Sequence, residues 1–472
     1  MAIPRPNPVL AFVLSLFVLR VTFVYPLSSF CPVDNYLIDC GSAADATLDV
    51  DGRCFTGDSS QSGAGCLSAA RTISLRDQNP PLGSSPIYET ARVLTRPSRY
   101  EFKIRDKGTH MVRLHFHRFD SVRYNLSGAQ FHVSANGFLL LSNFTGQTTE
   151  RPVIKEYMIW VDGEKLVISF TPTKISKIAF VNAIEVISAP KDLIADTAQF
   201  VDHEKVVRID GLTKQALETV YRINVGGPKV TPFNDSLWRT WVPDDEFLVL
   251  RNGANRVYSS ARIRYQVGGA SREICPDNVY NSARVISSGN ASVPNYNITW
   301  VFPVAEGYKY LVRTHFCDIA SISLGLLYFN VYVNGYLAYE NLDMSYLTNM
   351  VLASPFYADF VIDGDNLDVL TVSVGPSNSS FPYNIDAILN GVEIMKMNNS
   401  MGSLDGKLSA ESVLKGCPRR NIGVLVPLVA AACLLLAASA VMQRRIRVKD
   451  SVGWSPLPVD ISEIRLKSGS QK

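Results

Sequence analysis

Two short stretches of the chain are nearly identical, and they constrain the fold more than any other feature. Ile87–Thr95 has the sequence IYETARVLT, and Val279–Ser287, about 190 residues later, has the sequence VYNSARVIS. Self-similarity at so long a period indicates a duplicated domain, because solenoid repeats recur every ~20–50 residues. At 472 residues the chain is also too long for one hydrophobic core. We therefore expect two copies of one domain.

Both copies predict short antiparallel strands. Val112–Phe116 alternates apolar and polar side chains, and Val312–Phe316 repeats the same alternation. Each is followed by a hairpin, which turns at Asn136–Gly137 in the first copy and at Asn334–Gly335 in the second. Asn-Gly is a strong hairpin signal because both turn residues must accept positive φ. The pattern predicts an all-β fold of two tandem β-sandwiches of the jelly-roll type.

Two apolar runs set the predicted boundaries at either end. The run from Val9 to Leu19 is too short to cross a bilayer and is typical of a secretory signal peptide. Residues 422–442 carry no charge and, at about 1.5 Å per residue, match a hydrocarbon core of roughly 30 Å. The predicted segments are a signal peptide at 1–27, domain A at 28–190, a linker at 191–218, domain B at 219–396, a stalk at 397–421, a transmembrane helix at 422–442 and a cytosolic tail at 443–472.

This topology is single-pass type I, with the N-terminal part outside the cell, and the glycosylation motifs agree with it. Every Asn-X-Ser/Thr triplet lies in the predicted outer segment. The triplets begin at Asn125, Asn143, Asn234, Asn290, Asn297, Asn378 and Asn398. Such triplets are N-glycosylation acceptors in secreted proteins. The net charge of +3 is too small to indicate nucleic-acid binding, and no basic stripe with interleaved aromatic residues is present.

The cysteines predict disulfides formed in an oxidising compartment. Cys275 and Cys317 are the only two in the second copy, so we predict that they pair. Cys417 lies just before the predicted membrane helix and is left over, and Cys433 lies within that helix. A cluster that allows three connectivities is formed by Cys31, Cys40, Cys54 and Cys66. The cluster has no CxxC spacing, so we expect no metal there, and no cofactor.

Taken together, these features resemble the plant malectin-like domain. In both copies a strand ending in glycine, at Gly41 and Gly226, precedes the Tyr-X-Thr/Ser-Ala-Arg motif, the Val-Arg-X-His-Phe strand and the Asn-Gly hairpin. A tandem pair before one membrane helix is similar to the receptor kinases of the FERONIA and THESEUS group. Gly453–Leu457 resembles the segment that precedes the kinase in that family. The tail contains no glycine-rich loop, His-Arg-Asp or Asp-Phe-Gly motif, so we expect a receptor-like protein that is not an enzyme.

The resemblance implies extracellular ligands and a place in the plasma membrane. The implied ligands are secreted rapid-alkalinisation-factor peptides presented with GPI-anchored LORELEI-like partners, or pectin and other wall glycans. Without a kinase, such a protein would sequester its ligand or associate with a full-length receptor kinase. Two alternatives stay open: a truncated form or gene model of a malectin-like receptor serine/threonine kinase, and a lectin-like wall-anchoring protein.

Candidate ligand-binding residues follow from the resemblance to malectin, a lectin in which aromatic rings stack on sugars. We expect this role for the tyrosines Tyr36, Tyr88, Tyr124, Tyr221, Tyr280 and Tyr308. The competing explanation places these rings in the sandwich cores, because strands of this class are rich in aromatic residues. Arg92 and Arg284 recur at the same place in each copy, and we expect each to be a structural ion-pair hub. No pair of carboxylates or nucleophile indicates a glycosidase.

Overall fold

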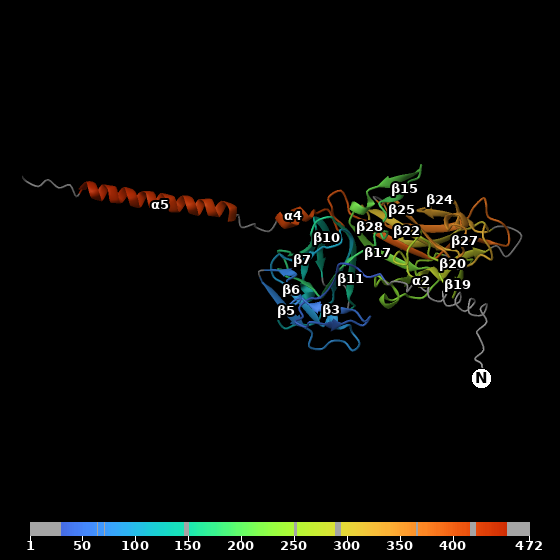
Figure 1. Cartoon of the computed structure of the whole chain (residues 1–472), viewed down its shortest axis with the longest axis horizontal. Coiled ribbons are helices and arrows are strands. Elements are labelled where there is room, and N and C mark those ends of the chain that lie inside the picture. The colour runs from blue at the N-terminus through green and yellow to red at the C-terminus, as the bar shows by residue number, and fades with distance from the viewer. Residues whose placement is uncertain are drawn as a thin grey trace, which may run out of the picture. The chain divides into compact units, whose positions relative to one another are not determined.

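Strands dominate the structure, as the alternating sequence predicts. The computed structural model describes residues 30–63, 65–69, 71–145, 151–249, 253–287, 294–364, 367–415 and 422–450. Residues up to Leu414 form one compact unit and those from Lys415 onward form another, which contains helix α5 (Ile422–Asp450) (Figure 1). The predicted signal peptide, Asn290, Cys417 and Gly453–Leu457 lie outside the described residues.

The largest sheet takes strands from both copies of the repeat. The first copy contributes β1 (Asn35–Asp39), β2 (Thr47–Leu48), β3 (Cys54–Gly57), β8 (Gly108–Phe116), β11 (Val153–Val161) and β14 (Ala183–Ser188). The remainder of the sheet consists of β15 (Thr197–Val201), β16 (Val206–Asp210), β17 (Leu217–Asn224), β18 (Val242–Pro243), β22 (Lys309–Cys317), β25 (Pro355–Asp363) and β28 (Gly391–Met397). Among the described residues this sheet has 13 strands in the order β16-β15-β25-β22-β28-β17-β11-β8-β14-β1-β3-β2, with β18 beside β17.

The two copies join where β11 pairs with β17. The paired residues are Tyr157 with Glu218 and Met158 with Leu217. Met111 and Met158 of the first copy share an apolar cluster with Trp241 and Met395 of the second. The structure is mostly β, as predicted, whereas the division into two tandem domains stays a prediction, because one compact unit contains both copies.

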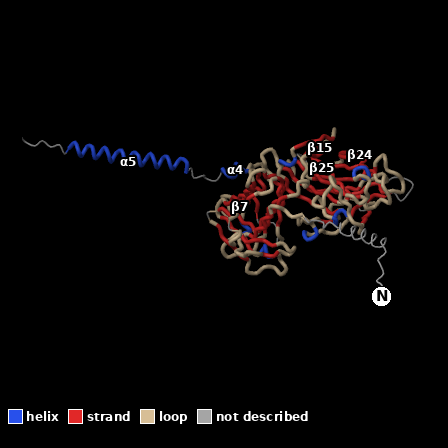
Figure 2. The backbone as a smooth tube through the Cα atoms, viewed as in Figure 1, coloured by secondary structure: helices blue, strands red, loops and turns tan. Residues whose placement is uncertain are grey.

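Each copy adds smaller sheets that complete its core. In the first copy, one sheet has β4 (Leu67–Ser68), β7 (Ser98–Lys103), β9 (Gln130–Ala135), β10 (Phe138–Thr145) and β12 (Lys165–Pro172), and another has β5 (Thr72–Arg76), β6 (Thr90–Leu94) and β13 (Ala179–Val181). The second copy has two corresponding sheets. The first contains β21 (Ile298–Pro303), β23 (Tyr328–Val333), β24 (Tyr336–Asp343) and β26 (Val369–Pro376). The second contains β19 (Asn255–Tyr258), β20 (Ser282–Ser287) and β27 (Ile385–Leu389). Helices are few and short within this unit (Figure 2). They are η1 (Pro86–Tyr88), η2 (Leu126–Gly128), η3 (Leu212–Lys214), η4 (Pro232–Asn234), α2 (Asp277–Tyr280), α3 (Met344–Leu347) and α4 (Ala410–Lys415).

The predicted strand faces and turns are confirmed. Val112, Leu114 and Phe116 are buried together in the first-copy core. The hairpin turns take positive φ at Asn136 (43°) and Asn334 (51°), as the Asn-Gly signal requires. The nine-residue motif also has a similar course in both copies, since each example begins in a short helix, the 3-10 helix η1 or the α-helix α2, and continues as a strand, β6 or β20.

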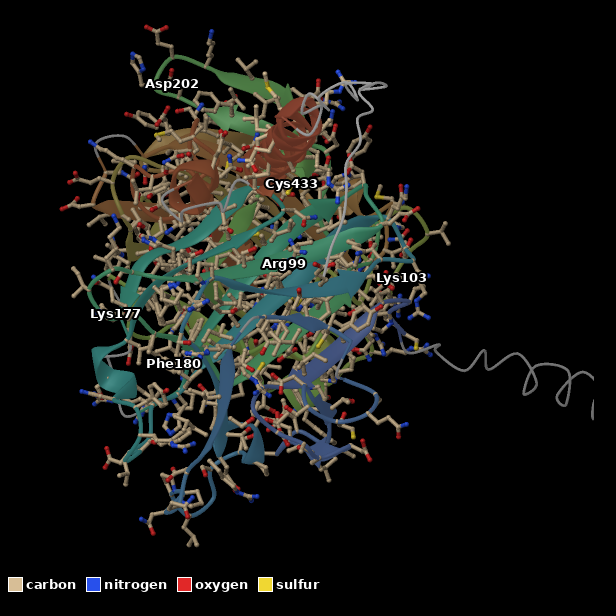
Figure 3. All side chains as sticks on the ribbon, turned by 90° about the vertical axis from the view of Figure 1, so that its left-hand side faces the viewer. Arg99, Lys103, Lys177, Phe180, Asp202 and Cys433 are labelled. Carbon is tan, nitrogen blue, oxygen red and sulfur yellow. The ribbon has the colours of Figure 1, made fainter. Side chains whose placement is uncertain are left out.

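Two segments predicted to be connections have more structure than expected. Within 191–218, β15 and β16 form a hairpin whose tip carries Asp202 (Figure 3), and β15 extends the large sheet beside β25. Within the predicted stalk, Leu404 is buried in the first-copy core and Ser403 bridges to Leu139. The hydrophobic periodicity of these short segments is weak, and their structure depends on pairing with strands far along the chain. The sequence therefore does not predict it.

The predicted disulfide between Cys275 and Cys317 is not confirmed by this structure. Both residues are free thiols, buried in the apolar cluster that joins the copies. The prediction relied on their being the only two cysteines in the copy, and that count does not determine whether the two sulfur atoms approach each other. The described cysteines of the first-copy cluster, Cys31, Cys40, Cys54 and Cys66, are also free.

The transmembrane prediction for residues 422–442 is not confirmed. Helix α5 covers these residues, but no helix within the described ranges meets the length and apolarity required to cross a membrane.

Candidate functional site

A row of alternating charges crosses the large sheet and passes through the junction between the copies. Arg113 on β8 bonds Glu185 on one side (2.8 Å) and Glu156 on the other (2.7 Å). Arg222 on β17 continues the row, because its guanidinium contacts Glu156 of the first copy at 2.6 Å and Glu393 of the second at 2.8 Å. These five side chains are buried. The row therefore links the two copies through paired charges on neighbouring strands.

The surrounding guanidinium groups keep these carboxylates ionised. Burial alone would raise the pKa of Glu156, but Arg222 and Arg113 lower this pKa to about 2. The pKa of Glu393 is lowered in the same way, with burial opposed by Arg222 and by a hydrogen bond from His315. Removing one member of such a row would leave an uncompensated buried charge.

At either side of the junction a tyrosine, a histidine and a glutamate form a hydrogen-bonded relay. In the first copy Tyr88 Oη lies 2.9 Å from His115 Nδ1, and His115 Nε2 lies 2.8 Å from Glu185 Oε1. The second copy repeats this arrangement with Tyr280, His315 and Glu393, at 3.4 Å and 3.2 Å. The duplicated motif thus places the same three groups in each copy.

The two relays differ in their access to solvent. The first-copy relay faces a cavity of about 710 Å³ whose lining includes Tyr88, Arg53, Tyr221 and Trp238. In the second copy Tyr280 is 0% exposed. The ring of Trp241 lies against the His315 ring, with 5.5 Å between centroids, and Tyr265 packs on Tyr280 at 6.4 Å. The first-copy relay therefore borders a cavity, whereas aromatic rings cover the second-copy relay.

The structure brings together two of the predicted tyrosines, Tyr88 and Tyr221, because both line this cavity. Tyr221 also has a packing role that Tyr36 shares. The hydroxyl of Tyr36 donates to the Lys103 carbonyl and that of Tyr221 to the Pro303 carbonyl, both at 2.6 Å. Each ring packs on a phenylalanine of its core.

The remaining predicted tyrosines lie elsewhere. Tyr280 belongs to the core cluster between the copies. Tyr308 accepts a hydrogen bond from the Gly406 amide at 2.7 Å, and its ring lies under Lys396. Tyr124 lines a separate depression beside Phe119. The sugar-binding role predicted for all six residues stays a prediction.

Several charged residues of the cavity were not among the predicted site residues, although the repeat contains a signal for them. Arg113 and Arg313 occupy the same position in the Val-Arg-X-His-Phe strands. Glu185 and Glu393 both follow an asparagine by three residues in the last strand of each copy. Both arginines and both glutamates are buried. Charged residues that recur at the same position in both copies therefore indicate buried positions of the large sheet.

The expectation for Arg92 and Arg284 is confirmed. Arg92 Nε bonds Asp58 at 2.9 Å, and Arg284 Nε bonds Asp244 at 2.5 Å. Each aspartate also accepts a hydrogen bond from the glycine amide that ends the opening strand, at 3.0 Å in both copies. The arginine is therefore a structural hub rather than a surface contact.

The predicted glycosylation sites differ in accessibility. The exposed ones are Asn125, Asn143, Asn234, Asn297 and Asn378. The Asn398 side chain is engaged within the unit, since it accepts from the Ala216 amide at 2.8 Å and donates to the Asn399 carbonyl at 3.0 Å. Within the described ranges, no group of three or more His, Cys, Asp or Glu side chains is placed to hold a metal ion.

Known proteins resemble this chain in both sequence and structure. A family model described as the malectin-like domain matches residues 38–397. The receptor-like protein kinases HERK 1 and THESEUS 1 of Arabidopsis thaliana are 40% and 39% identical to it, over 84% and 82% of this chain and 46% and 45% of their own length. A probable receptor-like protein kinase of the same organism is 44% identical over 91% of this chain and 52% of its own length. The chain thus spans about half the length of these relatives.

Solved ectodomains share the fold. The extracellular domain of ANXUR2 from Arabidopsis thaliana has a TM-score of 0.70 and 28% identity, covering 79% of this chain and 99% of that one. A structure of the plant peptide RALF23 in complex with FER and LLG2 has a TM-score of 0.68 and 31% identity, covering 80% of this chain and 99% of the matched chain. This chain therefore belongs to the malectin-like family, and its homologues are receptor-like kinases of the FERONIA, THESEUS and HERK type.

Proposed function

We propose that this chain provides the extracellular ligand-binding part of a cell-surface receptor. The observation that carries the proposal is the match to the complex of RALF23, FER and LLG2, which covers 80% of this chain at 31% identity. By analogy, the ligand is a secreted peptide of the rapid-alkalinisation-factor type, recognised together with a LORELEI-like protein. The chain would be held at the plasma membrane by the uncharged segment 422–442.

The exposed glycosylation motifs support an extracellular location for this unit. Asn125, Asn234 and Asn378 all present their side chains to solvent. An enzyme that transfers glycans in the secretory pathway requires such access. Expression in plant cells followed by glycosidase treatment should therefore lower the apparent mass, whereas an unchanged mass would contradict secretion.

Peptide binding can be tested on a fragment of residues 30–415. Biolayer interferometry would measure the affinity of a synthetic RALF-type peptide for this fragment, with and without a purified LORELEI-like protein. The proposal predicts saturable binding that becomes tighter when the LORELEI-like protein is present. A scrambled peptide of the same composition controls for nonspecific charge effects. The absence of binding by a panel of such peptides, with and without the partner, would refute the proposed ligand class.

A second candidate function, recognition of a wall glycan, is favoured by the first-copy cavity. Tyr88 and Trp238 contribute rings to its lining, and Arg53, whose guanidinium is paired with the buried Glu185 at 2.6 Å, contributes a polar group. Rings that stack on sugars beside such groups are typical of carbohydrate sites. A titration with pectin fragments should show weaker binding in Tyr88→Ala, whereas unchanged affinity would count against this cavity.

A further inference from the structure

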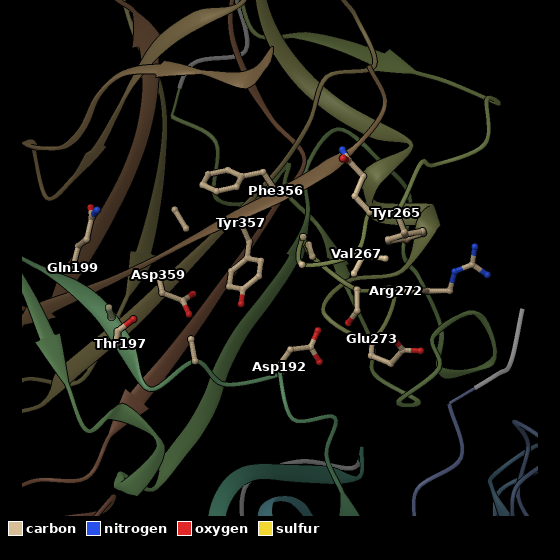
Figure 4. Close-up of a pocket in the computed structure, with 18 of the residues that line it drawn as sticks. Asp192, Thr197, Gln199, Tyr265, Val267, Arg272, Glu273, Phe356, Tyr357 and Asp359 are labelled. Carbon is tan, nitrogen blue, oxygen red and sulfur yellow. The ribbon is translucent and has the colours of Figure 1, made fainter. Parts of the chain in front are cut away.

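A groove separate from the first-copy cavity opens where two neighbouring strands diverge. β15 pairs with β25 only through Gln199 with Phe360 and Phe200 with Val361. A pocket of about 1160 Å³ lies at the unpaired ends of these strands, lined by Thr197 on β15 and Tyr357 on β25 (Figure 4). Residues 265–273 line it as well. The groove is therefore built by the hairpin and by a loop of the second copy.

The walls of this groove are aromatic. The rings belong to Tyr265, Tyr339, Phe356 and Tyr357, and none of them is fully buried. In Figure 4 the ring of Tyr357 extends from its strand toward Asp192. Aromatic faces attract cations through the ring quadrupole. Arg313 already lies 4.5 Å from the centroid of the Tyr357 ring, and Arg272 lies 5.3 Å from that of Tyr265. Among the described residues, Tyr339 and Phe356 are therefore the rings of the lining left for a positively charged occupant.

The charges of the lining leave a negative excess. Three charged residues are paired within the described structure: Asp359 with Arg313 (2.7 Å), Arg272 with Asp277 (3.1 Å) and Arg208 with Asp210 (3.7 Å). Asp192 and Glu273 also line the groove, and the described residues give neither of them an ion-pair partner. Two unpaired carboxylates therefore face the same space as the rings.

Unsatisfied polar atoms point to the same chemistry. Among the described residues, buried Gln199 Oε1 and Ser271 Oγ have no hydrogen-bond partner, and both residues line the groove. Arg272 Nε is also unpaired, but the guanidinium of this residue points away from the groove centre in Figure 4. A buried acceptor without a partner is costly unless a ligand or water satisfies it. An N–H donor of an occupant could satisfy either oxygen.

The backbone of β25 favours an extended peptide over a small cation. On its β22 side the strand is paired along its whole length. On the groove side, residues 356–359 have no strand partner in the described structure. Free edges of this kind accept an additional strand from another chain, which adds main-chain hydrogen bonds to side-chain recognition.

We propose that the groove between β15, β25 and residues 265–273 binds a lysine or arginine side chain carried by an extended segment of a peptide partner. The rings of Tyr339 and Phe356 and the carboxylates of Asp192 and Glu273 hold the cation, and the free edge of β25 aligns the backbone. The inference goes beyond the proposed function, because it assigns a surface and does not depend on the RALF-type identity of the ligand.

The test uses the full chain purified in detergent and fluorescent Gly/Ser peptides that differ only at one central residue. Fluorescence anisotropy should detect saturable binding of the arginine peptide and not of the matching glutamine peptide. The double variant Asp192→Asn/Glu273→Gln should weaken binding of the arginine peptide at least about tenfold. Glu306→Gln, at an exposed site outside the groove, should leave the affinity unchanged. Added salt should also weaken binding to the wild-type chain.

Both altered carboxylates lie at the groove surface, so we expect the double variant to fold, and far-ultraviolet circular dichroism will check this. A loss of binding can then be assigned to the lost charges. Equal affinity for the arginine and glutamine peptides would overturn the charge argument. Equal affinity of the wild-type chain and the double variant would overturn the assignment of this groove. If spermidine binds to the groove and the arginine peptide does not, the occupant is a free polyamine, and the proposed peptide partner is wrong.

Discussion

Tyr88 and Tyr280 show how one residue can have two roles in a duplicated chain. Both occupy the second position of the repeated nine-residue motif, and both contact a histidine of the adjacent strand. Trp241 and Tyr265 cover the second-copy relay, whereas the first-copy relay borders a cavity. A change in the neighbours, rather than in the motif, therefore separates a core residue from a candidate binding residue.

This difference predicts unequal stability effects. Tyr280→Ala should lower the free energy of unfolding by about 3–5 kcal/mol, the usual loss for a fully buried aromatic ring. Tyr88→Ala should lower it by only about 1–2 kcal/mol, because the Tyr88 ring is half-buried. Urea denaturation of residues 30–415, followed by circular dichroism, measures both values. Equal losses would show that the second-copy relay is as open as the first.

Glu156 carries a prediction about acid stability. Its pKa is about 2 in the folded chain and near 4.5 when unfolded, so between these values the unfolded chain binds more protons. The stabilisation is therefore fully present above pH 4.5 and is lost as the pH falls toward 2. Urea denaturation across this window should show a shallower loss of stability in Glu156→Gln than in wild type. Glu306→Gln, altered at an exposed position, serves as the control. Identical slopes in wild type and Glu156→Gln would contradict the ion pairs of Glu156 with Arg113 and Arg222.

At the scale of elements, local signals identified the hairpins and missed the strands that depend on distant partners. The turns at Asn136 and Asn334 were predictable because their chemistry is local. β15 was missed, because its alternation is short and its place is decided by pairing with β25, far along the chain. The charged row was also missed, since the sequence does not show that β11 lies beside β17.

The segment after β28 provides a test at this scale. Leu404 is 0% exposed within the first-copy core, although the sequence suggests a free stalk here. Leu404→Ala should lower the free energy of detaching this segment from β10 by about 2–5 kcal/mol. Hydrogen-exchange mass spectrometry should then show faster exchange at residues 399–406, and Leu408→Ala, at a position 40% exposed, should not. Exchange that is unchanged in Leu404→Ala would mean that the segment is not docked.

For the whole molecule, the repeat predicts a duplication but not how the copies are joined. A repeated motif gives the fold of each copy, and the joint depends on side chains that differ between them. Glu156 has its charge partners in both copies, and Tyr221 of the second copy lines the cavity of the first. The first-copy cavity is therefore a property of the joined copies rather than of either copy alone.

Differential scanning calorimetry of residues 30–415 tests this joint most directly. A continuous sheet with a buried row of charges predicts one cooperative transition, with equal calorimetric and van't Hoff enthalpies. Arg222→Met leaves Glu156 and Glu393 each without one cationic partner, so it should reduce stability by about 3–5 kcal/mol and separate the melting of the copies. Two separate transitions in the wild-type protein would contradict the claim that the duplicated copies form one body with a shared site.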